Sequence, residues 1–190
     1  MSSLTPQPLT SSGVSPSTDG INLHIGGWEK REGWFILDTL PGPHVDRVGN
    51  CNDLSFLADE SCAEVYASHV FEHLGYSGEL QKALRDVHRV LKPGGRLRAS
   101  VSDLEILCRL FLHPSLDANG RLHVMRMMFG GRMTEYDVHL VGLNFELFGG
   151  LLNEAGFRDI RRVPEFGLFQ DTSILRFCDV PISLNVEARK

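Results

Sequence analysis

The sequence is poor in cysteine and has no cysteine pair that would build a metal or disulfide site. Its 190 residues include four cysteines, with no Cys-x-x-Cys pair and none of the close spacings of a zinc centre. They are scattered singly among apolar residues, at Cys51, Cys62, Cys108 and Cys178. We therefore expect small core thiols in a reducing compartment and no disulfide framework.

The sequence also lacks an excess of positive charge and any long hydrophobic run. Lys and Arg total 19 against 24 Asp and Glu, for a formal net charge of −5. A general nucleic-acid binder would show a basic face, so this class is excluded. No stretch approaches the roughly 20 apolar residues that span a bilayer, and the N-terminus has no charged start followed by an apolar run. We expect a cytoplasmic protein that binds no membrane.

The length and the 42% hydrophobic content fit one globular domain with a sizeable core. Residues 1–20 are rich in Ser, Thr, Pro and Gly, and their apolar residues are too sparse to bury. Such a composition predicts a flexible N-terminal tail. Residues 21–190 then form the folded domain.

Short apolar runs alternate with amphipathic segments along this domain. Period-two or apolar runs predict strands at residues 21–25, 34–37, 45–48, 65–68, 97–101, 158–163 and 182–186. Helical spacing of apolar residues predicts helices at residues 80–91, 104–112, 125–129 and 145–155. Strands that alternate with helices favour an α/β fold, in which a mostly parallel sheet has helices on both faces.

Ligands bind such sheets at the carboxyl ends of the strands. Gly26 and Gly27 follow the first strand, and their missing side chains would let a ligand lie against the backbone, although such a pair is also an ordinary turn. Asp38 ends the second strand, where an acid accepts hydrogen bonds from two ribose hydroxyls. The alternative for Asp38 is a turn or cap aspartate.

Three further candidates follow the third strand. A carboxylate or amide of Asn52 or Asp53 would meet an adenine amino group, and Leu54 would cover the ring. The alternative is a local Asx-type cap, in which the side chain binds a nearby backbone amide.

The run His69-Val70-Phe71-Glu72-His73 has the spacing of the inverted zinc-peptidase motif. That motif requires an aligned helix and a third protein ligand, whereas His69 follows a strand. We expect Ser68 and His69 to line the cofactor cleft, and Glu72 and His73 to fix the next turn. A buried histidine satisfied by the backbone is the alternative to any catalytic role for His73.

A second candidate for proton chemistry is His139, which lies with Tyr136 and Asp137 in a polar connection. This connection would overhang the same cleft. A histidine there would deprotonate a hydroxyl acceptor as a general base. The alternative is a surface loop histidine.

The residues at 65–74, followed by Arg-Val-Leu-Lys-Pro-Gly-Gly-Arg-Leu at 89–97, resemble two motifs of class I S-adenosylmethionine (SAM)-dependent methyltransferases. They are similar in particular to the small bacterial type 11, or predicted, methyltransferases. Ala-Gly-Phe at 155–157 matches as well, so the similarity covers about residues 21–166. The resemblance implies a Rossmann-like sheet of seven strands with an antiparallel last strand, a transferase activity and SAM as cofactor.

The resemblance also implies roles for the residues at the strand ends. They are Ile25, Gly26 and Gly27 at the turn near the methionine part of SAM, Asp38 at the ribose, Asn52, Asp53 and Leu54 at adenine, and Ser68 and His69 at the sulfonium side. The candidate catalytic residues are His69 and His139, and no metal is expected.

The sequence departs from the family at its first turn. The usual Gly-x-Gly-x-Gly is reduced to residues 24–27, and only a dozen residues separate Gly26 from Asp38, so the first helix is expected to be shortened or absent. That helix normally directs backbone amides at the ligand.

The resemblance and the shortened glycine turn together leave two functional hypotheses. One is an enzyme that methylates oxygen or nitrogen of a small-molecule or sugar acceptor. The other is a non-catalytic SAM-binding or scaffold protein that retains the methyltransferase fold. The Met- and Phe-rich second half offers a face for a homodimer.

Overall fold

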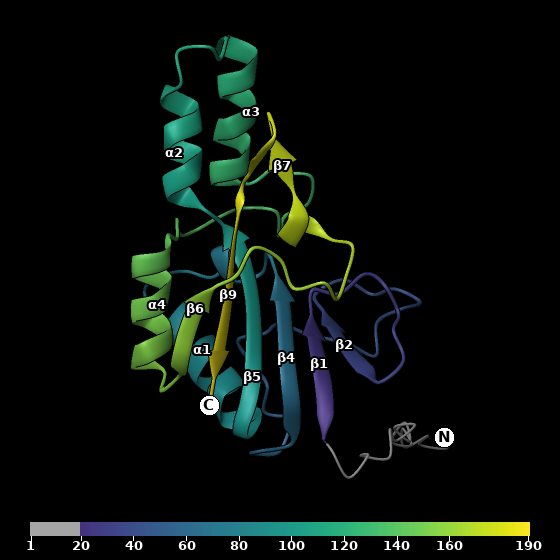
Figure 1. Ribbon diagram of the computed structural model, residues 1–190. Coiled ribbons are helices and arrows are strands. Elements are labelled where there is room, and N and C mark those ends of the chain that lie inside the picture. The colour runs from purple at the N-terminus through teal and green to yellow at the C-terminus, as the bar shows by residue number, and fades with distance from the viewer. Residues whose placement is uncertain (1–19) are drawn as a thin grey trace, which may run out of the picture.

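A computed structural model describes residues 20–190, so the expected tail lies outside the described residues apart from Gly20. Its centre is a seven-stranded sheet with the order β3-β2-β1-β4-β5-β9-β6 (Figure 1). The strands of this sheet are β1 (Ile21–Ile25), β2 (Trp34–Asp38), β3 (Arg47–Val48), β4 (Cys62–Ser68), β5 (Leu91–Ser102), β6 (Arg158–Arg162) and β9 (Ser183–Arg189).

Six strands of the sheet run in the same direction, and β9 runs opposite to them. β1 pairs in parallel with β2 and β4, β2 with β3, and β4 with β5, whereas β9 is antiparallel to both β5 and β6. The mostly parallel seven-stranded sheet confirms the expected fold class. The strand order reverses between β1 and β4, and this switch point is where open α/β sheets bind ligands.

Two helices cover one face of the sheet. They are α1 (Glu79–Val90) and α4 (Phe145–Glu154) (Figure 1). The apolar stripe of α1, which includes Leu80, Leu84 and Val87, is fully buried in one cluster with Val65 of β4 and Leu97 of β5. Burying this stripe is the main force that seats the helix, because each large side chain contributes roughly 1.5–3 kcal/mol.

Within residues 20–190, no α-helix covers the opposite face, which is a difference from the expected double cover. The connections that would supply those helices are residues 26–33 between β1 and β2 and residues 39–46 between β2 and β3. Both are shorter than the dozen or more residues of an ordinary helical crossover. The expected loss of the first helix is confirmed, since residues 26–33 contain none.

Aromatic packing takes the place of helices on this second face. His24, Trp34 and Tyr66 point to it from three strands, and Phe169 of the 163–175 segment packs on His24 and Tyr66 with ring centroids 4.2 and 4.9 Å away. The Tyr66 hydroxyl donates to Asp171 at 2.7 Å, which ties the segment down. The 163–175 segment crosses the front of the sheet in Figure 1.

A helical hairpin, α2 (Leu104–Leu112) and α3 (Ala118–Phe129), stands beyond the carboxyl ends of the parallel strands (Figure 1). It has a small core of its own, formed by Leu107, Leu110 and Val124 with Ile182. Beside it lie η2 (Thr172–Ile174) and the two-stranded β7 (Arg176–Phe177) and β8 (Val180–Pro181). No helix within residues 20–190 is long and apolar enough to cross a bilayer.

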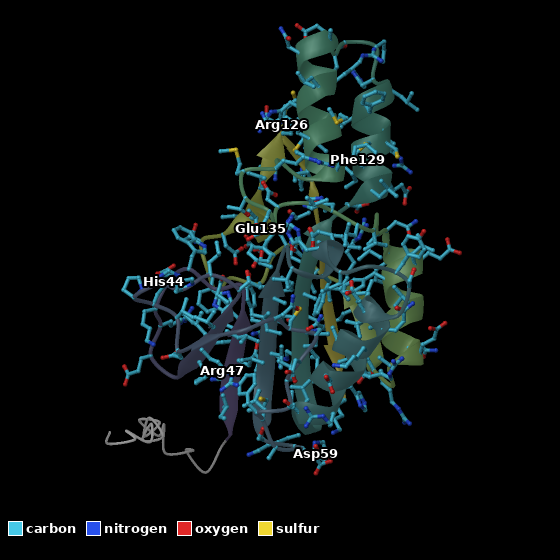
Figure 2. All side chains as sticks on the ribbon, turned by 180° about the vertical axis from the view of Figure 1, so that it is seen from behind. His44, Arg47, Asp59, Arg126, Phe129 and Glu135 are labelled. Atoms are coloured by element: carbon cyan, nitrogen blue, oxygen red, sulfur yellow. The ribbon has the colours of Figure 1, made fainter. Side chains whose placement is uncertain are left out.

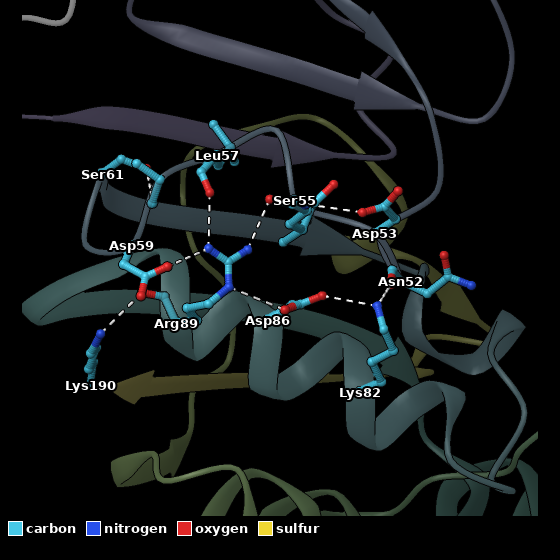
Figure 3. A network of polar contacts seen from close by, with 12 residues as sticks. Asn52, Asp53, Ser55, Leu57, Asp59, Ser61, Lys82, Asp86, Arg89 and Lys190 are labelled. Atoms are coloured by element: carbon cyan, nitrogen blue, oxygen red, sulfur yellow. Dashed lines mark hydrogen bonds and ion pairs between the residues drawn. The ribbon is translucent and has the colours of Figure 1, made fainter.

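The loop after β3 is fastened to α1 by Arg89, the first residue of the Arg-Val-Leu-Lys-Pro-Gly-Gly motif (Figure 3). Its guanidinium donates to the carbonyl oxygens of Leu54 and Leu57, each at 3.0 Å. It also pairs with the carboxylates of Asp59 at 2.7 Å and Asp86 at 3.3 Å. The motif thereby holds the loop that leads from β3 to β4.

Candidate functional site

A cavity of about 530 Å³ lies at the carboxyl ends of β1, β2 and β4, at the switch point of the sheet. Its walls come from the strand ends, the turn that contains η1 (Phe71–His73), and the 130–142 loop. The lining residues are Ile25, Gly26, Leu37, Asp38, Thr39, Gly49, Asn50, Cys51, Ser68, His69, Val70, His73, Leu74, Thr134, Glu135, Tyr136, Asp137, Val138 and Leu140.

The turn after β1 forms one wall from bare backbone. Gly26 has a φ of +72°, and its amide donates to the carbonyl oxygen of Leu37 at 2.8 Å. A Cβ on Gly26 would lie only 2.7 Å from Cγ2 of Val70, so a larger residue does not fit. Gly27 is outside the lining: it is buried on the aromatic face, where a Cβ would lie 2.6 Å from Nδ1 of His24.

Asp38 lies directly beside this turn, because Ile25 and Leu37 are paired between β1 and β2. Its Oδ1 accepts a hydrogen bond from the amide of Leu40 at 2.8 Å. Among residues 20–190, no group donates to Oδ2. Asp38 is thus a turn aspartate, and it also presents one carboxylate oxygen at the cavity wall.

The residues expected at adenine lie beyond the cavity wall. Oδ1 of Asp53 accepts from the amide of Ser55 at 3.1 Å, and hydrogen bonds from the side chain and then the amide of Ser55 lower the pKa of Asp53. The carbonyl of Asn52 accepts from Lys82, and the side chain of Leu54 is fully buried in the core. Asp53 therefore makes the local Asx-type cap that is the alternative to a contact with adenine.

Three residues closer to β3 line the cavity in their place. Gly49, Asn50 and Cys51 follow immediately after the two-residue strand. Oδ1 of Asn50 accepts from the amide of Asn52 at 3.0 Å, and Cys51 is 4% exposed. Burial raises the pKa of the Cys51 thiol to about 12, so it is neutral and adds an apolar surface to the wall.

At the end of β4, both ring nitrogens of His69 are engaged. Nδ1 lies 3.0 Å from Oε1 of Glu72, and Nε2 lies 2.9 Å from Oγ of Ser183. The hydroxyl of Ser183 donates to the carbonyl oxygen of Thr172 at 2.7 Å, so it accepts from Nε2. His69 lines the cavity as predicted from its position, but it would act as a base only after breaking one of these bonds.

Glu72 is buried beneath this turn with a side chain only 1% exposed. Burial raises its pKa, and the adjacent His69 outweighs burial, so the pKa of Glu72 is lowered. Its Oε1 also accepts from the amide of Ser102 at 3.0 Å. Oε2 is buried without a hydrogen-bond partner among residues 20–190. Glu72 therefore fixes the turn, as the sequence predicted.

The 130–142 loop forms one wall of the cavity. Asp137 ties it together by accepting from the amides of Gly131 at 3.3 Å and Met133 at 3.0 Å. Thr134, Glu135 and Tyr136 are carried over the cavity by this arrangement. Figure 2, seen from behind, shows Glu135 near the ends of the central strands.

Two histidines meet where this loop touches the η1 turn. Nδ1 of His73 lies 3.0 Å from the carbonyl oxygen of Val138, and the rings of His73 and His139 are 4.9 Å apart at 75°. His73 lines the cavity, whereas His139 lies behind it with Nδ1 buried and without a partner among residues 20–190. Burial lowers the pKa of His139. Its expected role as a base stays a prediction.

Residues 69–73 do not have the geometry of the inverted zinc-peptidase motif. His69 has a φ of +53° and precedes a single 3₁₀ turn, so the motif does not lie on one aligned helix. Among residues 20–190, no group of three or more His, Cys, Asp or Glu side chains is placed to hold a metal ion.

Comparison with known proteins agrees with this geometry. Residues 38–99 match the family model of a methyltransferase domain. A SAM-dependent methyltransferase from Archaeoglobus fulgidus superposes with a TM-score of 0.56 at 15% identity, over 91% of this chain and 87% of that one. One from Mesorhizobium loti gives 0.53 at 19% identity, over 92% and 93%.

Human N-acetylserotonin methyltransferase, solved in complex with SAM, gives a TM-score of 0.51 at 16% identity, over 90% of this chain and 47% of that one. A search of curated proteins found no match. The structural likenesses establish the fold. The family match runs from Asp38, the last residue of β2, to Ala99 within β5, and includes the cavity residues between them.

The fold and the family match confirm the resemblance to class I SAM-dependent methyltransferases. The match to the methyltransferase-domain model supports an enzyme of this class.

Proposed function

We propose that the cavity binds SAM and that the protein methylates a hydroxyl or amine of a small-molecule acceptor, such as a sugar. The observation that carries the proposal is the position of Asp38. Its carboxylate lies beside the Gly26 turn, at the wall of a cavity of about 530 Å³ at the switch point of the sheet. Pockets of this size hold small ligands.

The residues present fit the cofactor. The bare backbone at Gly26 leaves room for the methionine part, and Oδ2 of Asp38 is available to the ribose hydroxyls. Asn50 and the neutral thiol of Cys51 are the wall residues that would flank adenine. The shared position of these residues at three successive strand ends supports the assignment.

When bound, SAM supplies an activated methyl group on a sulfonium, so the protein contributes mainly position and exclusion of water. Ser68 and His69 line the end of β4, where the reacting groups would meet. Glu135 and Tyr136 of the 130–142 loop cover that place from above. The small-molecule acceptor is supported by the size of the cavity, about 530 Å³, and by a solved neighbour named for N-acetylserotonin.

The alternative, a scaffold that has lost catalysis, is favoured by one observation. Residues 26–33 contain no helix, so a helix N-terminus does not point at the ligand from this turn. Cofactor affinity separates the two functions. A cytoplasmic location and a homodimer stay predictions of the sequence.

Calorimetric titration of the full chain with SAM and with S-adenosylhomocysteine tests the proposal. We expect both to bind, and Asp38→Ala to weaken both by about tenfold or more, because hydrogen bonds to a charged group contribute roughly 1.5–3 kcal/mol. Asp53→Ala is the matched control, since this carboxylate lies beyond the cavity wall, and we expect it to keep the native affinity. If neither SAM nor S-adenosylhomocysteine binds to the native chain, the proposal of a SAM-dependent enzyme is rejected.

A further inference from the structure

The ring of His73 is held in one tautomer by the 130–142 loop. Its Nδ1 lies 3.0 Å from the carbonyl oxygen of Val138, and a carbonyl oxygen only accepts. Nδ1 therefore carries the proton. In a neutral imidazole the other nitrogen, Nε2, is then an acceptor.

Nε2 of His73 is also accessible. It makes no hydrogen bond to residues 20–190, and it is not among the buried polar atoms that lack a partner. Since the ring lines the cavity and Nδ1 faces the loop, Nε2 is the nitrogen that the ring presents to the cavity.

The two neighbouring histidines differ from His73 in this respect. Both nitrogens of His69 face acceptors, Glu72 and Ser183. His139 does not line the cavity, and its Nδ1 is buried. Among the histidines around Glu72, His73 alone offers a free lone pair to the cavity.

We propose that His73 is the general base of the reaction and that the acceptor is a hydroxyl compound whose proton is taken by Nε2. This inference rests on the proposed function of the cavity. Neither the fold nor the motif at residues 69–73 assigns the role of general base to His73, since the motif predicts only a residue that fixes the turn. An alcohol or phenol needs such a base, since its neutral oxygen is a weak nucleophile.

The proton and the methyl group balance. The acceptor oxygen gains the methyl group as its O–H proton passes to Nε2 of His73, and the sulfonium S–C bond breaks to leave a neutral thioether. The imidazolium of His73 then returns its proton to solvent.

The charges around His73 suit a ring that becomes cationic. Asp137 interacts electrostatically with His73, and the amide of Met133 lowers the pKa of Asp137, so this carboxylate is ionised at neutral pH. His139, which packs edge-on against the ring, is kept neutral because burial lowers its pKa. Glu72, on the same turn, has its charge directed at His69.

The tautomer is tested by ¹⁵N NMR of imidazole-labelled full chain. We expect His73 to show a protonated, pyrrole-like Nδ1 and an unprotonated, pyridine-like Nε2. His73→Asn identifies the signals by their loss and keeps an amide that can donate to Val138. A protonated Nε2 in the neutral ring would overturn the proposal.

The position of His73 at the site of methyl transfer is tested by modification of the protein with diethyl pyrocarbonate, followed by mass spectrometry. At ten times its Kd, S-adenosylhomocysteine should slow modification of His73 about tenfold and shift its Nε2 resonance. His44, on the 39–46 connection and outside the cavity lining, is the internal control and should keep its rate.

The outcomes separate the two proposals. If S-adenosylhomocysteine binds by calorimetry but leaves the modification rate and the resonances of His73 unchanged, the base is overturned and the SAM site stands. If it does not bind at all, both the SAM site and the base are rejected.

Discussion

Two glycines near the first strand share a left-handed backbone but not an environment. Gly26 and Gly33 have φ values of +72° and +79°. A Cβ on Gly26 would lie 2.7 Å from Val70, whereas a Cβ on Gly33 would meet no atom within 4 Å. The pair therefore separates the cost of the backbone conformation from the cost of filling the cavity wall.

We predict that Gly26→Ala lowers both stability and cofactor affinity. The left-handed backbone costs an alanine roughly 1 kcal/mol or more, and Val70 must also move away from the new methyl group. Denaturant unfolding and calorimetric titration with SAM measure the two effects. Gly33→Ala should show the loss of stability with native affinity, and equal affinity of both variants would contradict the assigned wall.

Sequence could predict Gly26 and Asp38 because each directly ends a strand with clear periodicity. The adenine-side residues proposed from sequence, 52–54, do not line the cavity, because β3 is only Arg47–Val48 and the residues directly after it, Asn50 and Cys51, lie at the wall. The sequence motif singled out His73 and left its role open, but it could not give the tautomer, which depends on the carbonyl of Val138, 65 residues away.

Among the elements, α1 has a structural task in addition to covering the sheet. Arg89 on its last turn holds the loop after β3 through two backbone carbonyls and two carboxylates. This loop begins at the cavity wall with Gly49, Asn50 and Cys51, so the Arg89 network (Figure 3) ties the loop that carries these residues to the helix.

We predict that Arg89→Ala lowers the free energy of unfolding by about 1–3 kcal/mol, because two carbonyl acceptors lose a charged donor. Arg89→Lys should recover only part of this loss, since an ammonium cannot reproduce the planar fork of a guanidinium. Thermal or urea unfolding measures both variants.

Arg85→Ala is the control on the same helix. Arg85 is exposed and makes no hydrogen bond or ion pair with residues 20–190, so we expect a change within about 0.5 kcal/mol. Equal losses for Arg85→Ala and Arg89→Ala would show that helix propensity, rather than the network, sets the stability.

At this scale, the periodic elements were predictable and the irregular ones were not. The apolar spacing of α1 and the alternation in β1 directly encode the faces that they bury. The 163–175 segment has no periodicity, although Phe169 is 5% exposed and takes the place of a missing helix. Its position depends on partners such as Tyr66, which lie about a hundred residues earlier.

For the molecule as a whole, the helix-free face makes stability dependent on pH. His24 is 2% exposed among aromatic rings, and burial lowers its pKa to about 4, against a smaller opposing effect of Asp171. The unfolded chain takes up this proton near pH 6.5, while the folded chain does so only near pH 4. Stability therefore falls as the pH is lowered through this window.

We predict that His24→Phe removes part of this acid sensitivity. The lowered pKa of His24 corresponds to about 3 kcal/mol between pH 7 and 4, and phenylalanine cannot be protonated. Urea unfolding of both proteins over this range gives the difference. The lowered pKa values of His88 and His139 act in the same direction, so a residual slope is expected. Parallel curves for the two proteins would refute the assignment to His24.

The hydrogen bond from Nδ1 of His73 to the carbonyl oxygen of Val138 makes the tautomer of His73 depend on the position of the 130–142 loop. The loop is also attached to Glu72, the residue before His73: the amide of Leu140 donates to the carbonyl oxygen of Glu72 at 2.8 Å. If the Val138 carbonyl moved away, the imidazole proton would be free to take either nitrogen. Nε2 is therefore fixed as an acceptor by the loop position seen here, and a substitution that displaces residue 138 would remove that selection without touching the histidine.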